Sequence, residues 1–334
     1  MQNKAYKFFN KINKSPTILQ PLINRWFKSA RVIKIELIKD KYIIDDQYKI
    51  LSLITLKHWP QKTLILEIHD NLDYWQRSIF ALKNFSRFKN SGKPMVAKLF
   101  YANKKMGIIF REDINVASLN LLIAQKKISK KKLAEIIKIA AWWLAQLHAY
   151  PIKKITAALK LKLNLKIEKK ILYKTLEFIK PNIEGRRRQI KKNLDFLLSA
   201  MANEKRFCLI HGDYQPANMM IKDGRLKIID FDTLEVGHPG RDLGRFSQQI
   251  NTFASKKTAR ELNQIFLAEY FKHSQLNYEN VKKSIALHQA EMIQYNILDA
   301  IWGGKIPNTD LIKKLINKQT NLLKKYENSA SCRT

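Results

Sequence analysis

Cysteine is scarce in this chain, and long apolar runs are missing from it. The 334 residues include two cysteines, Cys208 inside an apolar run and Cys332 near the end. Two cysteines so placed cannot build the disulfide framework of a small secreted domain. No stretch reaches the roughly 18 to 20 uncharged apolar residues of a membrane-spanning helix, and the basic N-terminus has no apolar segment of signal-peptide length. We therefore expect a soluble protein in a reducing, cytoplasmic compartment.

Acidic residues are few beside basic ones. The chain has 62 Lys and Arg against 28 Asp and Glu, a formal net charge of +34. Such a charge attracts anions, including nucleic acid, acidic lipid headgroups and phosphorylated metabolites. The basic residues are spread along a sequence that is rich in Lys, Ile and Asn throughout, so compositional bias is the favoured explanation. A nucleic-acid or membrane-surface binder rests on charge alone, and no specific nucleic acid is predicted because no recognition module is found.

The residue pattern changes character near residue 115. From Arg31 to Phe110 the apolar runs are short and β-rich, with one amphipathic segment between the third and fourth runs. After that the pattern is helical, except for a strand pair between Phe207 and Asp230. We expect an α+β chain with a small antiparallel β lobe over residues 1–114, which includes a basic extension over about 1–30. A larger helical lobe should span residues 115–334, joined by a hinge at about 111–116.

A strong turn signal lies in the second half of the chain. Asp223-Gly224 separates two apolar runs, and both residues tolerate the positive φ angles of a type I′ hairpin turn. Counting outward from the turn places Asn218 opposite Ile229, beside Asp230. The hairpin is thus predicted to bring an amide oxygen and a carboxylate to the same end.

These two oxygen donors suggest phosphoryl-transfer chemistry. Asn218 and Asp230 offer the hard oxygen ligands that Mg²⁺ accepts, with water and substrate phosphates completing the coordination. Asp213 lies five residues before Asn218 on the same loop. It is placed to take or orient the proton of an attacking hydroxyl while a metal neutralises the phosphates.

The motifs around these residues carry a family resemblance. HGDYQPAN, IIDFD and GHPGRDL, together with WWLAQLHAYP further upstream, resemble the signature of the aminoglycoside phosphotransferase and choline kinase family, which has a two-lobed protein-kinase-like fold. The resemblance implies ATP as the donor, Asp213 as the catalytic base, and Asn218 and Asp230 as metal ligands. It also implies that Asp242 supports the catalytic loop. His211 is expected to pack and hydrogen-bond within that loop.

The resemblance weakens in the first lobe. A kinase fold covers the phosphates with a glycine-containing turn and anchors them with a strand lysine paired to a helix acid. Here the first glycine is Gly92, and Glu67 stands about where that lysine is expected. The following helix offers Gln76 or Arg77 near the position of the acid. Lys57, at the end of the preceding strand run, is the candidate nucleotide-binding residue.

Three functions remain open from the sequence. The intact catalytic set favours an ATP- and Mg²⁺-dependent phosphotransferase that moves the γ-phosphate to a hydroxyl of a small-molecule or lipid- or sugar-linked acceptor. The alternatives are a catalytically impaired kinase-fold binding protein and the basic surface binder described above. Glu291 and Asp299 are candidate acceptor-binding acids, because they share a helical face with Tyr295 and Trp302. Core packing and pairing with lysines explain these four residues equally well, and the positive charge disfavours a cationic acceptor.

Overall fold

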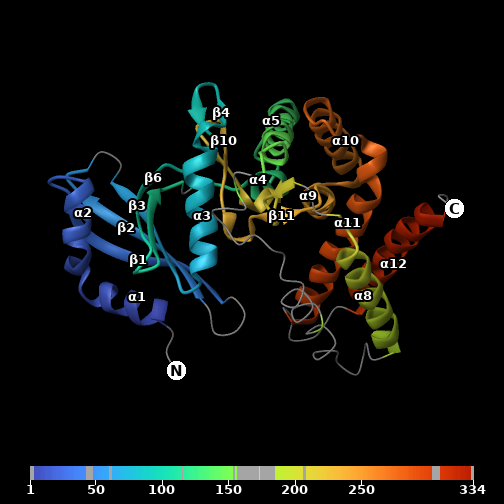
Figure 1. Cartoon of the computed structure of the whole chain (residues 1–334), viewed down its shortest axis with the longest axis horizontal. Coiled ribbons are helices and arrows are strands. Elements are labelled where there is room, and N and C mark those ends of the chain that lie inside the picture. The colour runs from blue at the N-terminus through green and yellow to red at the C-terminus, as the bar shows by residue number, and fades with distance from the viewer. Residues whose placement is uncertain are drawn as a thin grey trace. The chain divides into compact units, whose positions relative to one another are not determined.

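The computed structural model describes most of the chain as two compact units (Figure 1). The described residues are 4–42, 48–59, 62–114, 116–152, 155, 173, 185–205, 208–302 and 309–331. The first unit comprises Met1–Ala117 and Met219–Thr233, and the second comprises Ser118–Asn218 and Leu234–Thr334. The first is built on a β-sheet and the second is mostly helical, as the expected α+β class requires.

A five-stranded antiparallel sheet forms the first unit. Its order is β1-β2-β3-β7-β6, with β1 (Arg31–Tyr42), β2 (Tyr48–Lys57), β3 (Thr63–His69), β6 (Leu99–Asn103) and β7 (Ile108–Glu112). Helix α3 (Leu72–Asn84) follows β3, and the short pair β4 (Lys89–Asn90) and β5 (Lys93–Pro94) precedes β6. The predicted sheet with one inserted helix is confirmed, although the run expected as a strand from Met95 joins the sheet only at Leu99.

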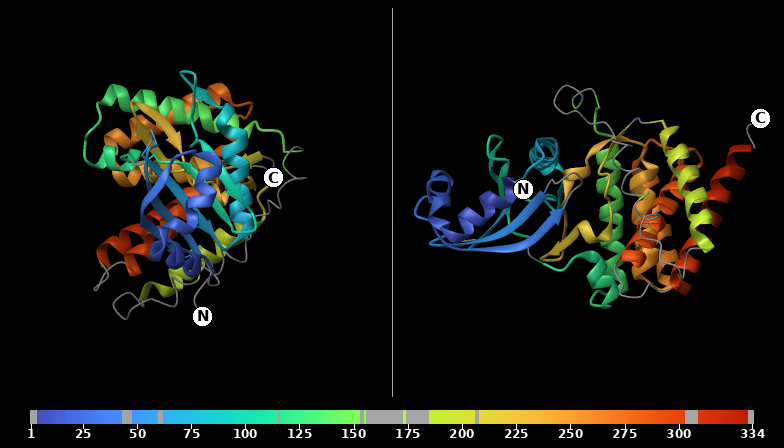
Figure 2. Two further views of the ribbon diagram at one scale, coloured as in Figure 1. Left: turned by 90° about the vertical axis from the view of Figure 1, so that its left-hand side faces the viewer. Right: turned by 90° about the horizontal axis from the view of Figure 1, so that it is seen from below.

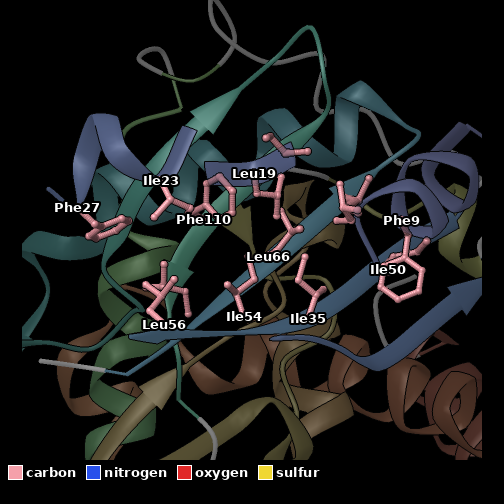
Figure 3. Packing of buried hydrophobic residues seen from close by; sticks show 14 of the residues in the cluster. Phe9, Leu19, Ile23, Phe27, Ile35, Ile50, Ile54, Leu56, Leu66 and Phe110 are labelled. Carbon is pink, nitrogen blue, oxygen red and sulfur yellow. The ribbon is translucent and has the colours of Figure 1, made fainter. Parts of the chain in front are cut away.

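The N-terminal extension folds onto one face of this sheet. It forms α1 (Lys4–Lys14), the 3-10 turn η1 (Pro16–Leu19) and α2 (Gln20–Trp26). Phe9, Ile23 and Phe27 pack with Ile54 and other aliphatic side chains of the sheet in one buried cluster (Figure 3). Burial of this cluster fixes the position of both helices, since isolated helices this short are marginal in water. The sequence had suggested only a basic extension.

The opposite face of the sheet carries charge. Side chains alternate along a strand, so Leu66 points to the α1–α2 cluster while Glu67 points to the other face. Helix α3 lies on that second face: its residues Ser78 and Leu82 line the same small pocket as Glu67. The indole N–H of Trp75 donates to the Ile108 carbonyl at 3.0 Å and so ties the helix to β7.

The predicted hairpin is present with its predicted register. Strands β9 (Met219–Lys222) and β10 (Arg225–Ile228) pair so that Met219 faces Ile228. Asp223 and Gly224 have φ angles of 51° and 70°, as a type I′ turn requires. We expected the hairpin in the helical lobe, but its contacts join it to the first unit, where Ile228 forms a bridge with Val96.

The second unit is helical apart from one small strand pair. Its helices are α4 (Leu119–Ala124), α5 (Lys130–His148), α8 (Arg187–Ala202), α9 (Gly240–Phe253), α10 (Lys256–His273), α11 (Tyr278–Trp302) and α12 (Thr309–Ser331). Helix α11 packs along α9 and α12, and α8 packs beside α11 and α12 (Figure 2). Strand β8 (Cys208–Ile210) pairs with β11 (Glu235–Gly237), a partner that the sequence analysis missed. No helix among the described residues has the length and apolar character needed to cross a membrane.

Candidate active site

A buried aspartate holds the loop between β8 and β9. Asp242, in the first turn of α9, accepts backbone N–H bonds from His211 at 2.7 Å and Gly212 at 2.9 Å. Its carboxylate also lies 3.1 Å from His148 Nε2. Burial raises the pKa of Asp242, but the bond and charge of His148 and the contacts with His211 outweigh it and lower the pKa. A charged Asp242 therefore fixes the loop backbone, which is the contact that a loop-supporting aspartate would make.

Within the second unit, several hydrogen-bond donors surround the Asp213 carboxylate. The Asp213 carboxylate accepts from Gln215 Nε2 and from Asn218 Nδ2, both at 2.9 Å. Asn218 Nδ2 also donates to the Asp213 carbonyl, and Arg245 Nη1 lies 3.4 Å from the carboxylate. The Asp213 side chain keeps 21% of its surface exposed. The structure thus joins Asp213 and Asn218, which were predicted as base and metal ligand.

The predicted supporting histidine is fully buried in this loop. His211 packs edge-on against Tyr214, with ring centroids 5.8 Å apart. The Tyr214 hydroxyl donates to the Ala140 carbonyl of α5 at 2.7 Å, and its ring stacks on Trp143. Helix α5, which contains most of the WWLAQLHAYP segment, therefore packs against the loop and supports it. This packing accounts for the aromatic residues of the segment.

Glu291, a predicted acceptor-binding acid, is committed to internal ion pairs. It is fully buried and pairs with Arg241, Arg245 and His288. The guanidinium groups hold the Glu291 pKa well below its usual range, against the opposing effect of burial. Its carboxylate supports the arginine that reaches Asp213 and is not presented at a surface of this unit. Asp299, the other predicted acid, lies eight residues further along α11 and is exposed.

The same network contains a histidine that should make stability depend on pH. Burial lowers the pKa of His288, but Glu204 and Glu291 raise it to about 9. In the unfolded chain the pKa of this histidine is about 6.5, so the folded state binds its proton more tightly. The resulting stabilisation of the fold is fully present below pH 6.5 and is lost as the pH rises through 9. We expect the free energy of unfolding to fall by up to about 3 kcal/mol between pH 7 and pH 10 because of this residue.

Denaturant unfolding of the parent and of His288→Gln across this range measures the effect. The variant should show a flatter profile, and the difference between the two curves isolates His288 from other groups that titrate at high pH. His273→Gln, on α10, is the matched control because His273 sits at the surface beside Glu269. Parallel curves for the parent and His288→Gln would contradict the assignment.

The first unit contains the remaining predicted metal ligand. Asp230 follows β10 with a φ of 66°, in the left-handed region that few residues other than glycine adopt. Its Oδ1 lies 3.0 Å from Lys49 Nζ, and its side chain is 25% exposed. Lys49 also donates to Asp232 Oδ2 at 2.7 Å, and Ser78 donates to Asp232 Oδ1 at 2.8 Å. The second acid of the IIDFD motif is thus anchored to both β2 and α3.

Glu67 occupies the middle of this charged face as an anion. Arg111 Nε donates to its carboxylate, His69 Nε2 lies at 3.1 Å and Lys49 Nζ at 3.8 Å. Burial raises the Glu67 pKa, but the charges of Lys49 and Arg111 lower it well below its usual range. An acid held in its charged form cannot anchor phosphate.

The structure does not bring Lys57 to this cluster. Lys57 is exposed at the end of β2 and pairs with Arg31, eight residues along the strand from Lys49, or about 26 Å. Lys49 is the basic residue that the sequence analysis missed. The signal was available in principle, because strand alternation places Lys49 on the face opposite Ile50, which belongs to the apolar cluster.

The donor set can be compared with what a metal ion needs. The described residues contain no group of three or more His, Cys, Asp or Glu able to hold a metal by themselves. Mg²⁺ is commonly held by one or two carboxylates together with substrate phosphates. Asp230 offers a partly exposed carboxylate. Among the described residues, both hydrogen bonds of the Asn218 amide use Nδ2, which leaves its oxygen as the donor atom for a cation. Each of these two oxygen donors, taken by itself, is of the kind that Mg²⁺ accepts.

Comparison with known proteins gives a match to a family model over slightly less than half of the chain, and a fold. Residues 121–281 match the model of APH, the phosphotransferase enzyme family. No curated protein matches the chain. The family match confirms the resemblance read from the motifs, and with it the expectation of a phosphotransferase of the kinase type.

Solved structures share the fold over nearly the whole chain. The GDP and kanamycin complex of APH(2")-IIia has a TM-score of 0.58 at 13% identity, covering 93% of this chain and 98% of that one. The streptomycin-ATP ternary complex of APH(2")-IIa gives 0.54 at 16% identity, covering 92% and 97%. The choline kinase LicA from Streptococcus pneumoniae gives 0.55 at 16% identity, covering 94% and 100%. At these identities the likeness shows the fold alone, and it confirms the predicted kinase-like architecture.

Proposed function

We propose that the chain is an ATP- and Mg²⁺-dependent phosphotransferase that moves the γ-phosphate to a hydroxyl of a small-molecule or lipid- or sugar-linked acceptor. The observation that carries the proposal is the Asp213–Asn218 pair on a loop whose backbone is held by the buried Asp242. Phosphoryl transfer depends on positioning and charge more than on covalent chemistry, so a rigid loop of this kind suits it. The matched family and the nucleotide complexes of APH(2")-IIa and APH(2")-IIia support a nucleotide donor.

Each residue has a defined part in the proposed reaction. Asp213 accepts the hydrogen bond of the acceptor hydroxyl, orients it toward the phosphorus and takes its proton as the new P–O bond forms. Gln215 and Arg245 hold the carboxylate in one orientation. Asn218 and Asp230 would hold Mg²⁺, which when bound neutralises charge on the phosphates.

The acceptor pocket is constrained by what the described acids do. A polycationic acceptor would need exposed carboxylates to recognise it. Glu291 is instead paired with two arginines and a histidine. Asp299 is the exposed member of the predicted pair. Combined with the net charge of +34, this favours a neutral or anionic hydroxyl compound. A sugar, or a phosphorylated or lipid-linked acceptor, fits this description.

A kinase-fold binding protein without turnover is the second candidate. It is favoured by Glu67, an acid on the strand where the phosphate-anchoring lysine is expected. ADP release against a panel of hydroxylated metabolites, run beside calorimetry with Mg²⁺-ATP, separates the two functions. Acceptor-dependent ADP release supports the enzyme, whereas nucleotide binding without transfer to any acceptor supports the binder.

Asp230→Asn should weaken nucleotide binding and turnover together. The substitution removes the charge of a proposed metal ligand, so Mg²⁺-dependent ATP affinity and ADP release should each fall on the order of 10²-fold. Calorimetry with and without Mg²⁺ measures the effect, which should vanish when Mg²⁺ is omitted. Asp223→Asn is the matched control, since Asn also suits the type I′ turn of the same hairpin. A loss of ATP affinity that persists unchanged without Mg²⁺ would remove Asp230 as a metal ligand.

A further inference from the structure

A buried lysine, Lys49, sits among the acids of the first unit. Its side chain is 4% exposed, with Nζ 3.0 Å from Asp230 Oδ1 and 2.7 Å from Asp232 Oδ2. The ammonium group has three N–H donors. Two are used by these carboxylates, and the Glu67 oxygen at 3.8 Å is beyond hydrogen-bond range. Among the described residues the third donor has no hydrogen-bond partner, so it can serve a further oxygen.

Strand register explains how a lysine of β2 comes to lie beside Glu67 of β3. Leu51 pairs with Glu67 and Lys49 pairs with His69, so Lys49 is the diagonal neighbour of Glu67 on one face of the sheet. On the other side of β3, Glu67 pairs with Ile109, which makes Arg111 its second diagonal neighbour. The middle strand thus carries the acid, and its two neighbours carry the cations.

The two cations of this cluster, Lys49 and Arg111, pair with different carboxylates. Arg111 donates to Glu67 and to the carbonyl of Glu112, and within the described part of the chain it forms no hydrogen bond or ion pair with Asp230 or Asp232. Lys49 serves both of those aspartates. Counting Lys49 and Arg111 against the three carboxylates leaves one negative charge in excess. A divalent cation on Asp230 reverses that balance, and an anion is then needed beside Lys49.

Lys49 stays charged in this setting. Its ammonium group lies within ion-pair distance of the Asp230 and Asp232 carboxylates, and opposite charges this close favour the charged form. A permanent cation with a spare donor next to the proposed metal ligand has the chemistry that phosphate oxygens require.

We propose that Lys49 is the phosphate-anchoring residue of this protein, acting from β2 in place of the lysine expected on β3. The inference rests on the proposed function and replaces Lys57 in that role. When Asp230 is engaged by the metal, Lys49 keeps Asp232 as its internal partner and donates its remaining N–H groups to phosphate oxygens of the nucleotide. Glu67, with Arg111, holds the neighbouring strands in register and takes no part in phosphate binding.

The test compares a nucleoside with its nucleotide. Calorimetry with adenosine and with ATP, each in Mg²⁺ and in EDTA, is run on the parent, Lys49→Met, Lys49→Arg and Lys57→Met. Loss of a charge-assisted hydrogen bond should lower ATP affinity of Lys49→Met by about 10- to 100-fold. Adenosine affinity should stay within about twofold because adenosine has no phosphate. The loss should persist in EDTA, unlike that of Asp230→Asn. Lys49→Arg should recover part of the affinity, and Lys57→Met should match the parent.

A second variant protects the test against misfolding, since Lys49→Met leaves buried carboxylates without a cation. Lys49→Met/Glu67→Lys moves the cation to β3, on the same face of the sheet as Asp230 and Asp232, and should restore ATP affinity to within about tenfold of the parent. Equal losses for adenosine and ATP, or unchanged ATP affinity in Lys49→Met, would overturn the anchor while leaving the proposed function standing. A parent that binds no nucleotide would overturn the proposed function and the anchor with it.

Discussion

Asp213→Asn is expected to lower acceptor-dependent ADP release by about 10² to 10⁴-fold while Mg²⁺-ATP affinity stays near that of the parent. The substitution removes the proton acceptor and keeps the size of the side chain. Asn218 Nδ2 can still donate to the residue 213 carbonyl, as it does in the parent. Asp242 still holds the backbone of His211 and Gly212, so the loop should keep its shape.

The measurement is turnover under saturating acceptor beside calorimetry with Mg²⁺-ATP. Gln215→Ala is the informative companion, because Gln215 touches the same carboxylate at 2.9 Å without supplying chemistry. Gln215→Ala should lower turnover far less than Asp213→Asn. The expected loss is about tenfold, the effect of one lost orienting hydrogen bond. Turnover of Asp213→Asn equal to that of the parent would eliminate the proposed base. A large loss of nucleotide affinity in the same variant would recast Asp213 as a binding residue.

The hairpin and its loop could be predicted from the sequence because their determinants are local. Asp223-Gly224 fixes the turn, and a two-residue turn fixes the whole register, so pairing of Met219 with Ile228 followed by counting. Asp213 and Asn218 are five residues apart, and a loop of that length keeps them together. Asp242 is further away in the chain, and its contact with the loop was reached through the family resemblance.

Lys49 could not be predicted in the same way because its position depends on the loop between β2 and β3. The register that pairs Lys49 with His69 is set by residues that carry no single strong turn signal, so counting from the sequence gives several answers. Lys57 was chosen because it ends the strand run that precedes β3. Strand geometry instead sends it to the far end of the sheet from Asp230. The pairing of Glu291 with two arginines was not foreseen for a related reason: a helical face read from spacing does not show what that face meets.

The joining of the hairpin to the first unit has the same origin. The bridge between Val96 and Ile228 and the contacts of Lys222 and Lys227 with Glu112 are long-range. Nothing in the local pattern of residues 219–233 indicates which unit they join. From the order of elements in the sequence, we assigned these residues to the helical lobe on either side of them. Their contacts in the structure assign them to the unit that contains the sheet.

Glu291→Gln should destabilise the second unit by about 3 to 5 kcal/mol, because it removes the anion from a buried cluster of cations. Arg241 keeps its partner Glu235 and His288 keeps Glu204, but Arg245 loses the nearer of its two carboxylates and keeps the contact with Asp213 at 3.4 Å. Its guanidinium lies over the Tyr295 ring at 5.6 Å, so it cannot reach water without disturbing the packing of α11. Buried positive charge without a counter-ion is the cause of the loss.

Urea unfolding monitored by circular dichroism measures the change. Glu135→Gln is the matched control: Glu135 belongs to an exposed pair with Lys132 on α5, and such pairs contribute about 1 kcal/mol or less. Glu291→Gln should also disturb the contact between Arg245 and Asp213, so turnover should fall while nucleotide affinity does not. A variant as stable as Glu135→Gln would show that the cluster tolerates its cations unpaired, and Glu291 would then be available again as an acceptor-binding acid.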